Sequence, residues 1–389
     1  MSLYQGRGNI SMQDEYMDFI NYVFGFNGRD SDFYKLLPKL YKPEYDPAAQ
    51  SYVAVEDGRI KAAVGAFDDE LIIGSERFAL RGIGNVAVHP FCRRRGYMNN
   101  LMNMAVREMI EDGVTLSFLG GRRQRYGFFG YEQGCAVHSA AVDRDNFRYV
   151  YGGGAENRPV RLRLREERVE ANDSYRLSYI KEKIDSCHAR CVRPAEKLYD
   201  ILVSWRDSAY VFLDDWGRLR GYGVGSGGGL NELWLDDDSL TPDALYVHIS
   251  ASGEYRVSLT LPPDKAAQRR AIHDLMNDIS IENGKMLNVF AYERLLRACL
   301  KYSEEYRRLG DFDFVALIHG SGGDERLRIA CFGGETSVEK TEKAADVELS
   351  ALRAVSFFFG ASSPERDGMD AAARGAFPLA LGVHNCDGV

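Results

Sequence analysis

An arginine-rich turn between an apolar strand and a helix is the part of this sequence best suited to chemistry. The segment reads Gly84-Asn-Val-Ala-Val-His-Pro-Phe-Cys-Arg-Arg-Arg-Gly-Tyr-Met98, with a β-type run before Pro90 and a helical pattern after Gly96. A strand that turns into a helix leaves several backbone N–H groups unpaired, and the helix dipole adds partial positive charge there. Three arginine side chains add charge-assisted donors. These groups together predict a pyrophosphate-binding turn, with an ordinary surface turn as the alternative.

The turn resembles the acetyl-CoA-binding motif of the GNAT N-acetyltransferases, Gln/Arg-x-x-Gly-x-Gly/Ala. Here it reads Arg93-Arg94-Arg95-Gly96-Tyr97-Met98, and Met98 stands where the family has a small residue. The resemblance implies acetyl-CoA as co-substrate and no metal. It places the pantetheine arm on the strand, the pyrophosphate on the turn and further contacts at the end of the next strand. The implied cofactor-binding residues are Val86, Ala87, Val88, Arg93, Arg94, Arg95, Gly96, Tyr97, Met98, Asn99, Gly121 and Arg122.

The elements around the turn have the periodicities that such a site needs. Apolar residues recur at helical spacing over 98–110, and Gly113 follows as a stop signal. The paired β-rich runs before the turn surround a hairpin signature. Strands are predicted at 51–55, 60–67, 77–88, 114–119 and 135–142. This order matches the GNAT fold.

Composition limits the class of protein. The chain has 389 residues, of which 45% are hydrophobic and 12% aromatic, as expected for a globular protein of two or three domains. A net charge of −8 argues against a general nucleic-acid binder. We expect no membrane span and no signal peptide. The seven scattered cysteines predict neither a disulfide framework nor a zinc site, so a reduced, cytoplasmic protein is expected.

The middle of the chain repeats the hairpin and helix pattern of the first part but lacks an arginine-rich turn. Strands at 209–213 and 219–224 form a predicted hairpin, and a helix is predicted over 266–279. The glycine run Ser226-Gly-Gly-Gly229 has no basic partner and no helix start, so it is interpreted as a loop. Residues 149–284 therefore resemble a degenerate second GNAT copy that binds no cofactor.

Helix, sheet and helix follow in the last part of the chain, in an order that resembles a sterol-carrier-protein-2-like domain. Residues 312–319 and 326–332 alternate like antiparallel strands, and 346–359 is predicted to be a helix. The predicted fold is α/β (α+β), with tandem GNAT folds and this third domain. The expected domains are an active GNAT domain at 1–148, a degenerate one at 149–284 and a sterol-carrier-protein-2-like domain at 285–389.

A second chemical segment, Gly120-Gly-Arg-Arg-Gln-Arg-Tyr-Gly-Phe-Phe-Gly-Tyr131, follows the predicted strand at 114–119. In a GNAT sheet the acyl thioester lies where two strands splay apart, and Tyr126 comes just beyond the second of them. A phenol has an unperturbed pKa near ~10, so it stays protonated at neutral pH and can protonate a departing thiolate. Packing against the neighbouring aromatic residues explains the same tyrosine equally well.

The three-part plan and the signatures Val86-Ala-Val-x-Pro-x-x-Arg-Arg-Arg-Gly96 and Tyr126-Gly-x-Phe-Gly-Tyr131 resemble the Eis (enhanced intracellular survival) acetyltransferases. The resemblance implies that Tyr126 is the general acid. It implies that the carboxylate of the C-terminal residue, here Val389, is the proton acceptor. The family often ends in an aromatic residue, so valine is a departure, although a carboxylate does not depend on its side chain.

Other residues near these signatures have open roles. Glu132, Asp68 and Asp69 are alternative acids for the part of the base, and His89 is expected to be structural. The extra arginines after Gly121 are candidates for the adenosine 3′-phosphate or for a shift towards less cationic acceptors.

The expected reaction moves an acetyl group from acetyl-CoA to a primary amine, either of an aminoglycoside-like polyamine or of a lysine side chain. The resemblance also implies a homo-oligomer, with the hexamer as the family's assembly, and neither nucleic acid nor membrane as partner. Two alternatives stay open. One is N-acylation with a longer chain, and the other is a CoA-sensing or apolar-ligand-binding protein without catalysis.

Overall fold

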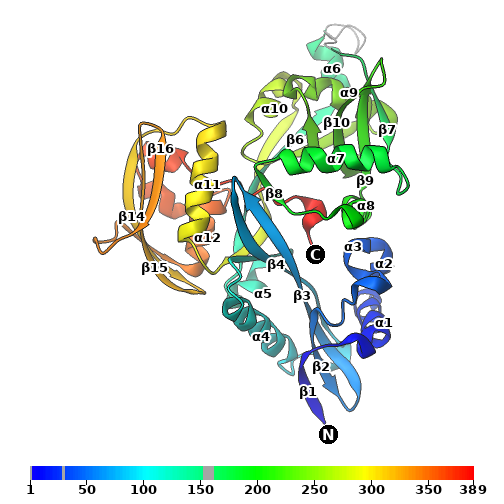
Figure 1. Cartoon of the computed structure of the whole chain (residues 1–389), viewed down its shortest axis with the longest axis vertical. Helices are drawn as coiled ribbons and strands as arrows, with labels where there is room; N and C mark the ends of the chain where they lie inside the picture. Colours follow the sequence, from blue (N-terminus) through cyan, green and yellow to red (C-terminus); the bar gives the residue numbers. More distant parts are fainter. Residues whose placement is uncertain (1, 29–30, 152–161) are drawn as a thin grey trace.

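The computed structural model describes residues 2–28, 31–151 and 162–389, and most of its strands belong to one long sheet (Figure 1). Within the described residues this sheet has 13 strands in the order β1-β2-β3-β4-β5-β13-β6-β12-β11-β10-β9-β7, with β8 paired to β3. The strands are β1 (Leu3–Arg7), β2 (Ser51–Glu56), β3 (Arg59–Ile73), β4 (Glu76–Val88), β5 (Leu116–Leu119), β6 (Glu132–Asp143), β7 (Leu164–Arg168), β8 (Ala189–Cys191), β9 (Ser208–Asp214), β10 (Leu219–Ser226), β11 (Gly229–Leu235), β12 (Arg256–Leu261) and β13 (Asp278–Val289).

A second sheet of four strands, β16-β15-β14-β17, lies at one side of the molecule. Its strands are β14 (Phe312–Gly320), β15 (Gly323–Phe332), β16 (Glu335–Lys340) and β17 (Val347–Ser350). The helices are α1 (Gln13–Gly25), α2 (Phe33–Leu36), α3 (Pro38–Tyr41), α4 (Tyr97–Glu111), α5 (Arg123–Tyr126), α6 (Arg144–Val150), α7 (Ser174–Ser186), α8 (Leu198–Leu202), α9 (Thr241–Ser252), α10 (Ala266–Ala271), α11 (Glu293–Tyr306), α12 (Ala351–Phe359) and α13 (Ala371–Gly375).

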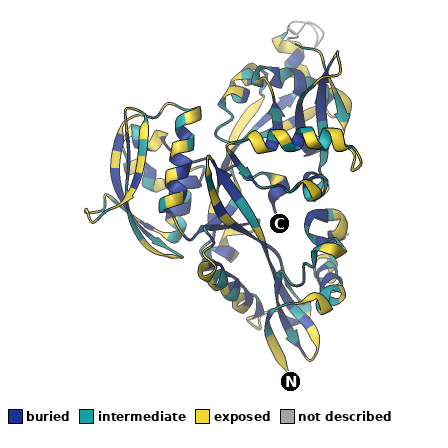
Figure 2. Ribbon diagram, viewed as in Figure 1, coloured by how far each residue is buried: buried dark blue, intermediate teal, exposed yellow. Residues whose placement is uncertain are grey.

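Different helices cover the two faces of the first half of the long sheet. α1, α2 and α3 pack on one face, over a core that contains Ala63, Phe67 and Ala87. α4 packs on the other face, over Ala62 and Val64. Neighbouring residues of β3 therefore belong to opposite faces, both of which are covered. Figure 2 shows this layering, with strands that are largely buried and helices that are exposed along their outer sides.

α4 connects β4 to β5, which lie parallel and side by side. Its apolar stripe is buried against the sheet, which confirms the helix predicted over 98–110. Gly113, with a φ of 70°, follows the helix in a left-handed conformation that glycine adopts without strain. The sequence pattern and the structure agree here because the helix has one clearly apolar face.

The strand β13 comes from late in the chain but completes the first half of the sheet. It pairs with β5 over Met286–Val289 and with β6 over most of its length, antiparallel to both. Residues 278–284, which the sequence assigned to the middle domain, therefore lie in this strand. The prediction of a helix over 266–279 is wrong beyond Ala271, because α10 ends there and Asp278 already begins β13.

The second half repeats the strand and helix order of the first. β9, β10 and β11 form an antiparallel meander, and α9 then leads to β12, which lies parallel to β11. β2, β3, β4, α4 and β5 have the same arrangement. The turn between β11 and α9, however, contains Asp236, Asp237 and Asp238 in place of arginines. Three carboxylates there would repel a phosphate.

The last part of the chain packs its small sheet and α12 against the first half. One apolar core joins Leu80 and Phe118 of the long sheet to Phe314 and Phe358 of this part. The prediction of a helix over 346–359 is wrong at its start, because residues 347–350 form β17, parallel to β14. The side chain of Ser350 then caps α12 by accepting a hydrogen bond from the Arg353 N–H.

The final segment of the chain returns to the middle of the molecule. Residues 377–389 leave the small sheet, and the end marked C in Figure 1 lies between the two halves of the long sheet. Val389 packs against the core under α1, α2 and α3 as well as against the core shared with the small sheet. None of the helices in the described ranges is long and apolar enough to cross a membrane.

Candidate active site

The arginine turn forms one wall of a cavity of about 590 Å³. Arg94 has a φ of 68° and Gly96 a φ of 80°, so the backbone turns sharply just before α4 begins at Tyr97. No side chain caps this helix start, which leaves its first N–H groups open to a ligand. The cavity is lined by Val23, Val86, Val88, Cys92, Arg93, Arg94, Arg95, Gly96, Tyr97, Met98, Asn99 and Arg125.

The three arginines of the turn differ in whether they form an ion pair within the protein. Arg95 forms an ion pair with Glu56 at the end of β2, at 2.9 Å. Arg93 and Arg94 form no ion pair with any described residue, and both are exposed. Two uncompensated guanidinium groups beside an open helix N-terminus suit a ligand with several negative charges.

Three of the residues implied for cofactor binding do not line this cavity. Ala87 is buried on the opposite face of the sheet, where it packs with the core under α1. Gly121 and Arg122 lie at the start of the segment that leads to α5. Conversely, Val23 and Cys92 line the cavity although the sequence did not indicate them. Arg125 also lines it, and the sequence had offered this arginine for the 3′-phosphate or for a shift towards less cationic acceptors.

Tyr126 ends α5 and is buried against the core under α4. A Cβ added at Gly121 would lie only 2.3 Å from its ring, so the ring packs directly on this glycine. Burial raises the pKa of Tyr126 above its ordinary value, and the nearby Arg125 guanidinium acts in the opposite direction. The phenol therefore remains a proton donor at neutral pH.

A gap between β4 and β5 lies next to these groups. The two strands pair only from Leu80 to Ile83 on β4 and from Leu116 to Leu119 on β5. β5 then ends, whereas β4 continues to Val88 with a free edge on that side. An extra residue in β4 bulges the strand here: Ala63 pairs with Ala87 but Gly65 pairs with Gly84, and Asn85 has a φ of 48°. The edge of β4 is thus free to bind a ligand that enters the gap.

Val389 lies over β4 at this gap, on the face opposite α4. A Cβ added at Gly82 would lie 2.5 Å from its Cγ2 atom, and one added at Gly84 would lie 3.0 Å from its carboxyl carbon. The two glycines therefore leave the space that Val389 fills. Tyr126 packs on the α4 side and Val389 on the other, so the gap lies between a buried phenol and the last residue of the sequence.

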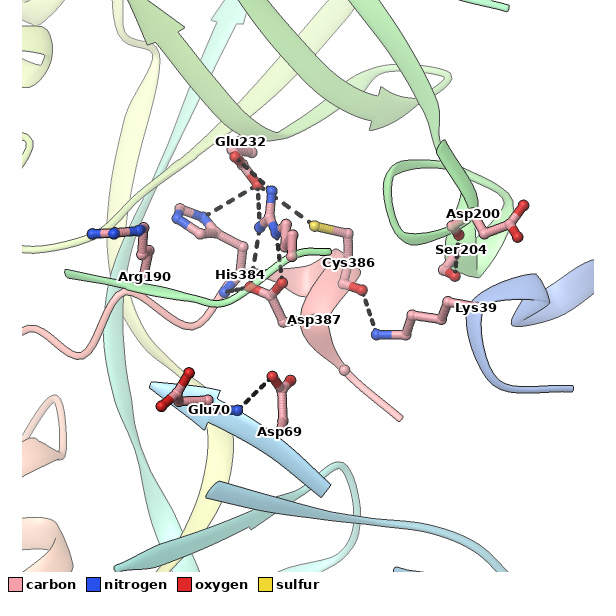
Figure 3. A network of polar contacts seen from close by, with 12 residues as sticks. Lys39, Asp69, Glu70, Arg190, Asp200, Ser204, Glu232, His384, Cys386 and Asp387 are labelled. Carbon is pink, nitrogen blue, oxygen red and sulfur yellow. Dashed lines mark hydrogen bonds and ion pairs between the residues drawn. The ribbon is translucent and has the colours of Figure 1, made fainter. Parts of the chain in front are cut away.

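Buried polar contacts hold the segment before Val389 (Figure 3). We call Lys39, Arg193, Trp205, Glu232 and Asp387 the tail network. Lys39 Nζ donates to the Cys386 carbonyl at 2.6 Å, and Trp205 Nε1 donates to the Gly388 carbonyl at 3.1 Å. Arg193 bonds Asp387 at 2.7 Å and Glu232 at 2.8 Å. Both halves of the long sheet thus contribute to the position of Val389.

The charges of the tail network compensate one another. Burial alone would raise the pKa of Glu232, but the adjacent Arg193 guanidinium holds it below its usual range. Asp387 shows the same balance, and its pKa is also lowered. Removing either partner of such a pair would leave an uncompensated buried charge, which typically costs about 3–5 kcal/mol.

Comparison with known proteins identifies the first part of the chain. Residues 8–134 match the sequence profile of the acetyltransferase (GNAT) domain. The chain contains a GNAT acetyltransferase domain. This identifies it as an acetyltransferase, and acyl-CoA is the ligand that the fold generally binds. No curated protein matches the sequence.

Solved structures share the fold over nearly the whole chain. A GCN5-related N-acetyltransferase from Kribbella flavida is 18% identical, with a TM-score of 0.64 and coverage of 98% of this chain and 96% of that one. A probable N-acyltransferase from Enterococcus faecalis is 15% identical, with a TM-score of 0.66 and 98% coverage of both chains. Eis1 from Mycobacterium abscessus is 14% identical, with a TM-score of 0.62 and coverage of 98% and 99%. At these identities the likeness extends to the fold alone.

In the GNAT domain, the cavity with the arginine turn fits the polyanionic end of an acyl-CoA. The side chains that the sequence offered as alternative bases have other surroundings. His89 accepts a hydrogen bond from the Phe91 N–H at 3.3 Å, and burial lowers its pKa, so it is a structural neutral imidazole. Asp68 pairs with Arg81, and Glu132 pairs with Arg123. Asp69 forms no ion pair within the described ranges.

Proposed function

We propose that this chain transfers the acetyl group of acetyl-CoA to a primary amine, with Tyr126 as general acid and the Val389 carboxylate as base. The observation that best supports this proposal is the gap between β4 and β5. The cavity with the arginine turn lies beside this gap, Tyr126 packs on one face and Val389 lies on the other. An acyl thioester in the gap would have a proton donor and a proton acceptor on opposite sides.

The proposed reaction needs both groups. An amine acceptor arrives mostly protonated, because a lysine-like amine has a pKa of about 10.4. Its proton passes to the Val389 carboxylate, directly or through water, and the free amine attacks the thioester carbonyl carbon. The C–S bond then breaks, and the departing thiolate takes the phenolic proton of Tyr126. Burial keeps Tyr126 protonated until this step. The nitrogen loses its second proton as the amide forms, and this proton restores the Tyr126 phenol through solvent. The proton held by Val389 is released to solvent, so the products are the acetylated amine, CoA thiol and one proton.

The proposal is tested by measuring CoA release from acetyl-CoA with a panel of primary amines. Tyr126→Phe should lower kcat by about 10²–10⁴, because it removes the proton donor and leaves the ring in place. Tyr131→Phe is the matched control, since this neighbouring phenol bonds Ser117 Oγ at 2.7 Å within the core. Equal rates for the two variants would overturn the role of Tyr126. If no amine releases CoA, the CoA-binding protein without catalysis replaces the enzyme proposal.

The role of Val389 has its own test. A protein that ends at Val389 should lose most of its kcat when one glycine is added, because the carboxylate moves one residue away from Gly84. A Val389→Ala variant keeps the carboxylate and should retain kcat within about threefold. Full activity in the extended protein would exclude the carboxylate as base.

The remaining expectations are also proposals. The repeated meander and crossover support a degenerate GNAT copy over the range 149–284, except for residues 278–284, which lie in β13. The acidic turn before α9 supports the absence of a second CoA site. The order of α11, the small sheet and α12 supports a sterol-carrier-protein-2-like domain over 285–389. We further propose Eis-like acceptors, namely aminoglycoside-like polyamines or lysine side chains, a homo-oligomeric state and a cytoplasmic location. Light scattering of the purified protein tests the oligomer.

A further inference from the structure

A second cavity lies beside Val389, on the face of the sheet away from the arginine turn. Its volume is about 360 Å³, within the range of small-molecule sites. Leu40 and Phe67 line it from the first half of the molecule, and Val192 and Ile201 line it from the second. This cavity reaches Val389 from the side opposite the acyl-CoA cavity. An amine acceptor could therefore enter through it without displacing the acyl-CoA.

The cations in the wall of this cavity are already engaged. Lys39 and Arg193 belong to the tail network, where Lys39 donates to a carbonyl and Arg193 joins two carboxylates. Lys197 lies over the ring of Tyr45, with its Nζ atom 4.0 Å from the ring centroid. None of these three side chains forms an ion pair with Asp69.

Asp69 is the carboxylate in this wall that forms no ion pair with a described side chain, whereas Asp68, Glu70 and Asp387 each pair with an arginine. It lies on β3 and points towards the final segment of the chain (Figure 3). Its Oδ1 atom accepts a hydrogen bond from the Glu70 N–H at 2.7 Å, and no ion pair forms with any described side chain. Burial, together with the negative charge of Asp387, raises the pKa of Asp69 to about 7, although the Glu70 N–H and the more distant charges of Lys39 and Arg193 act in the opposite direction. A cationic ligand would relieve this unfavourable charge.

We propose that Asp69 binds a second ammonium group of the acceptor, so that diamines and polyamines with well-separated nitrogens are the preferred substrates. This inference rests on the proposed acetyl transfer. The Val389 carboxyl group lies over Gly84, which pairs with Gly65, and Asp69 lies four residues further along β3. At about 3.4 Å per residue, that separation is about 14 Å along the strand. A diamine with an eight-carbon chain can place one nitrogen at each carboxylate, because the Asp69 side chain covers part of the distance.

The test compares diaminooctane, with its two terminal amines, and octylamine as acceptors. Asp69→Asn should raise KM for diaminooctane about tenfold to a hundredfold, because a hydrogen bond to a charged group is lost. KM for octylamine should stay within about twofold. Asp57→Asn is the matched control, because it removes the same charge from the exposed turn just before β3, and Asp57 does not line this cavity. It should leave both KM values unchanged.

The pH dependence separates recognition from a structural effect. KM for diaminooctane should fall as pH rises through 7 in the parent protein, as Asp69 ionises, and this step should be absent in Asp69→Asn. The other charged groups lining this cavity are Lys39, Asp68, Glu70, Arg193, Lys197 and Asp387, and both variants retain them. A KM for diaminooctane that is unchanged by Asp69→Asn, or raised equally for both acceptors, would overturn the inference.

Equilibrium binding keeps the inference distinguishable from the proposed function. If the parent protein releases no CoA with any amine, the proposed transfer has failed. Calorimetric titration of diaminooctane into the CoA-saturated parent and Asp69→Asn proteins then decides the role of Asp69. Weaker binding to the variant by tenfold or more supports the ammonium site, and equal binding excludes it.

Discussion

Single residues in this molecule set the geometry around the gap between β4 and β5. Gly121 supports the Tyr126 ring, and Gly82 and Gly84 leave room for Val389. At each of these three positions, the Cβ atom of any larger residue would clash with a neighbouring side chain or with Val389. The acid and the base of the proposed reaction therefore depend on residues that have no side chain of their own.

Gly121→Ala should lower kcat with little change in KM for acetyl-CoA. The added Cβ would lie 2.3 Å from the Tyr126 ring, so the phenol must move, and a displacement of about 1 Å can cost about a hundredfold in rate. Steady-state kinetics measures both constants. Gly120→Ala is the control, because an added Cβ there meets nothing within 4 Å. Equal kcat for the two variants would contradict the support of Tyr126 by Gly121.

Arg94→Gly should separate binding from stability. Arg94 has a φ of 68°, a conformation that costs a non-glycine residue of order 1 kcal/mol, so glycine should leave the unfolding temperature nearly unchanged. Loss of a free guanidinium from the acyl-CoA cavity should raise KM for acetyl-CoA about tenfold. Thermal unfolding and a salt series of KM measure the two effects. Arg77→Gly, at an exposed position near the start of β4 where the side chain pairs with Glu70, should leave KM unchanged.

The elements that bring these residues together are of two kinds. The turn, α4 and α5 are contiguous with the residues they position, whereas the segment before Val389 is held by contacts from α3, α8 and β11 and their neighbouring loops. The first kind depends on local backbone geometry. The second depends on buried polar contacts between residues far apart in the chain.

Lys39→Met should lower kcat at least tenfold and leave KM for acetyl-CoA within about threefold. The substitution keeps the chain length but removes the donor to the Cys386 carbonyl, so the final segment loses one of its anchors. The acyl-CoA cavity lies on the other face and should be unaffected. Lys35→Met is the control, since that side chain is 86% exposed on α2. Parallel losses of kcat in both variants would contradict the anchoring role.

The sequence predicted what is local in this fold and missed what is long-range. The arginine turn and α4 were predictable because strand, turn and apolar stripe follow one another in the chain. The helical pattern that begins at residue 266 was extended too far, to residue 279, so the start of β13 was missed. The partners of β13, β5 and β6, precede it by well over a hundred residues. For the same reason Val23 and the uncompensated Asp69 could not be found from spacing. The proton-acceptor role expected for Val389 came from a family resemblance.

At the scale of the whole molecule, Asp69 should make stability depend on pH. Its pKa is about 7 in the folded protein, so between about pH 4 and 7 the folded state holds a proton that the unfolded state has released. The free energy of unfolding therefore decreases as pH rises through this window, by up to about 4 kcal/mol for three pH units. Asp69→Asn should be more stable than the parent protein at pH 8 and similar at pH 4.5.

Thermal unfolding at the two pH values measures this difference. Asp68→Asn, which removes an exposed carboxylate paired with Arg81, should not show it. A stability gain that is the same at both pH values would contradict the assignment to Asp69.

The insertion of β13 between β5 and β6 has a consequence for synthesis on the ribosome. The GNAT sheet cannot close until residue 289 has left the exit tunnel, although β6 ends at Asp143. At about 5–20 residues per second, the facing edges of β5 and β6 wait unpaired for on the order of ten seconds. An unpaired edge is a template for wrong pairing. Nascent chains of this protein should therefore depend on chaperones during that interval more than their finished fold suggests.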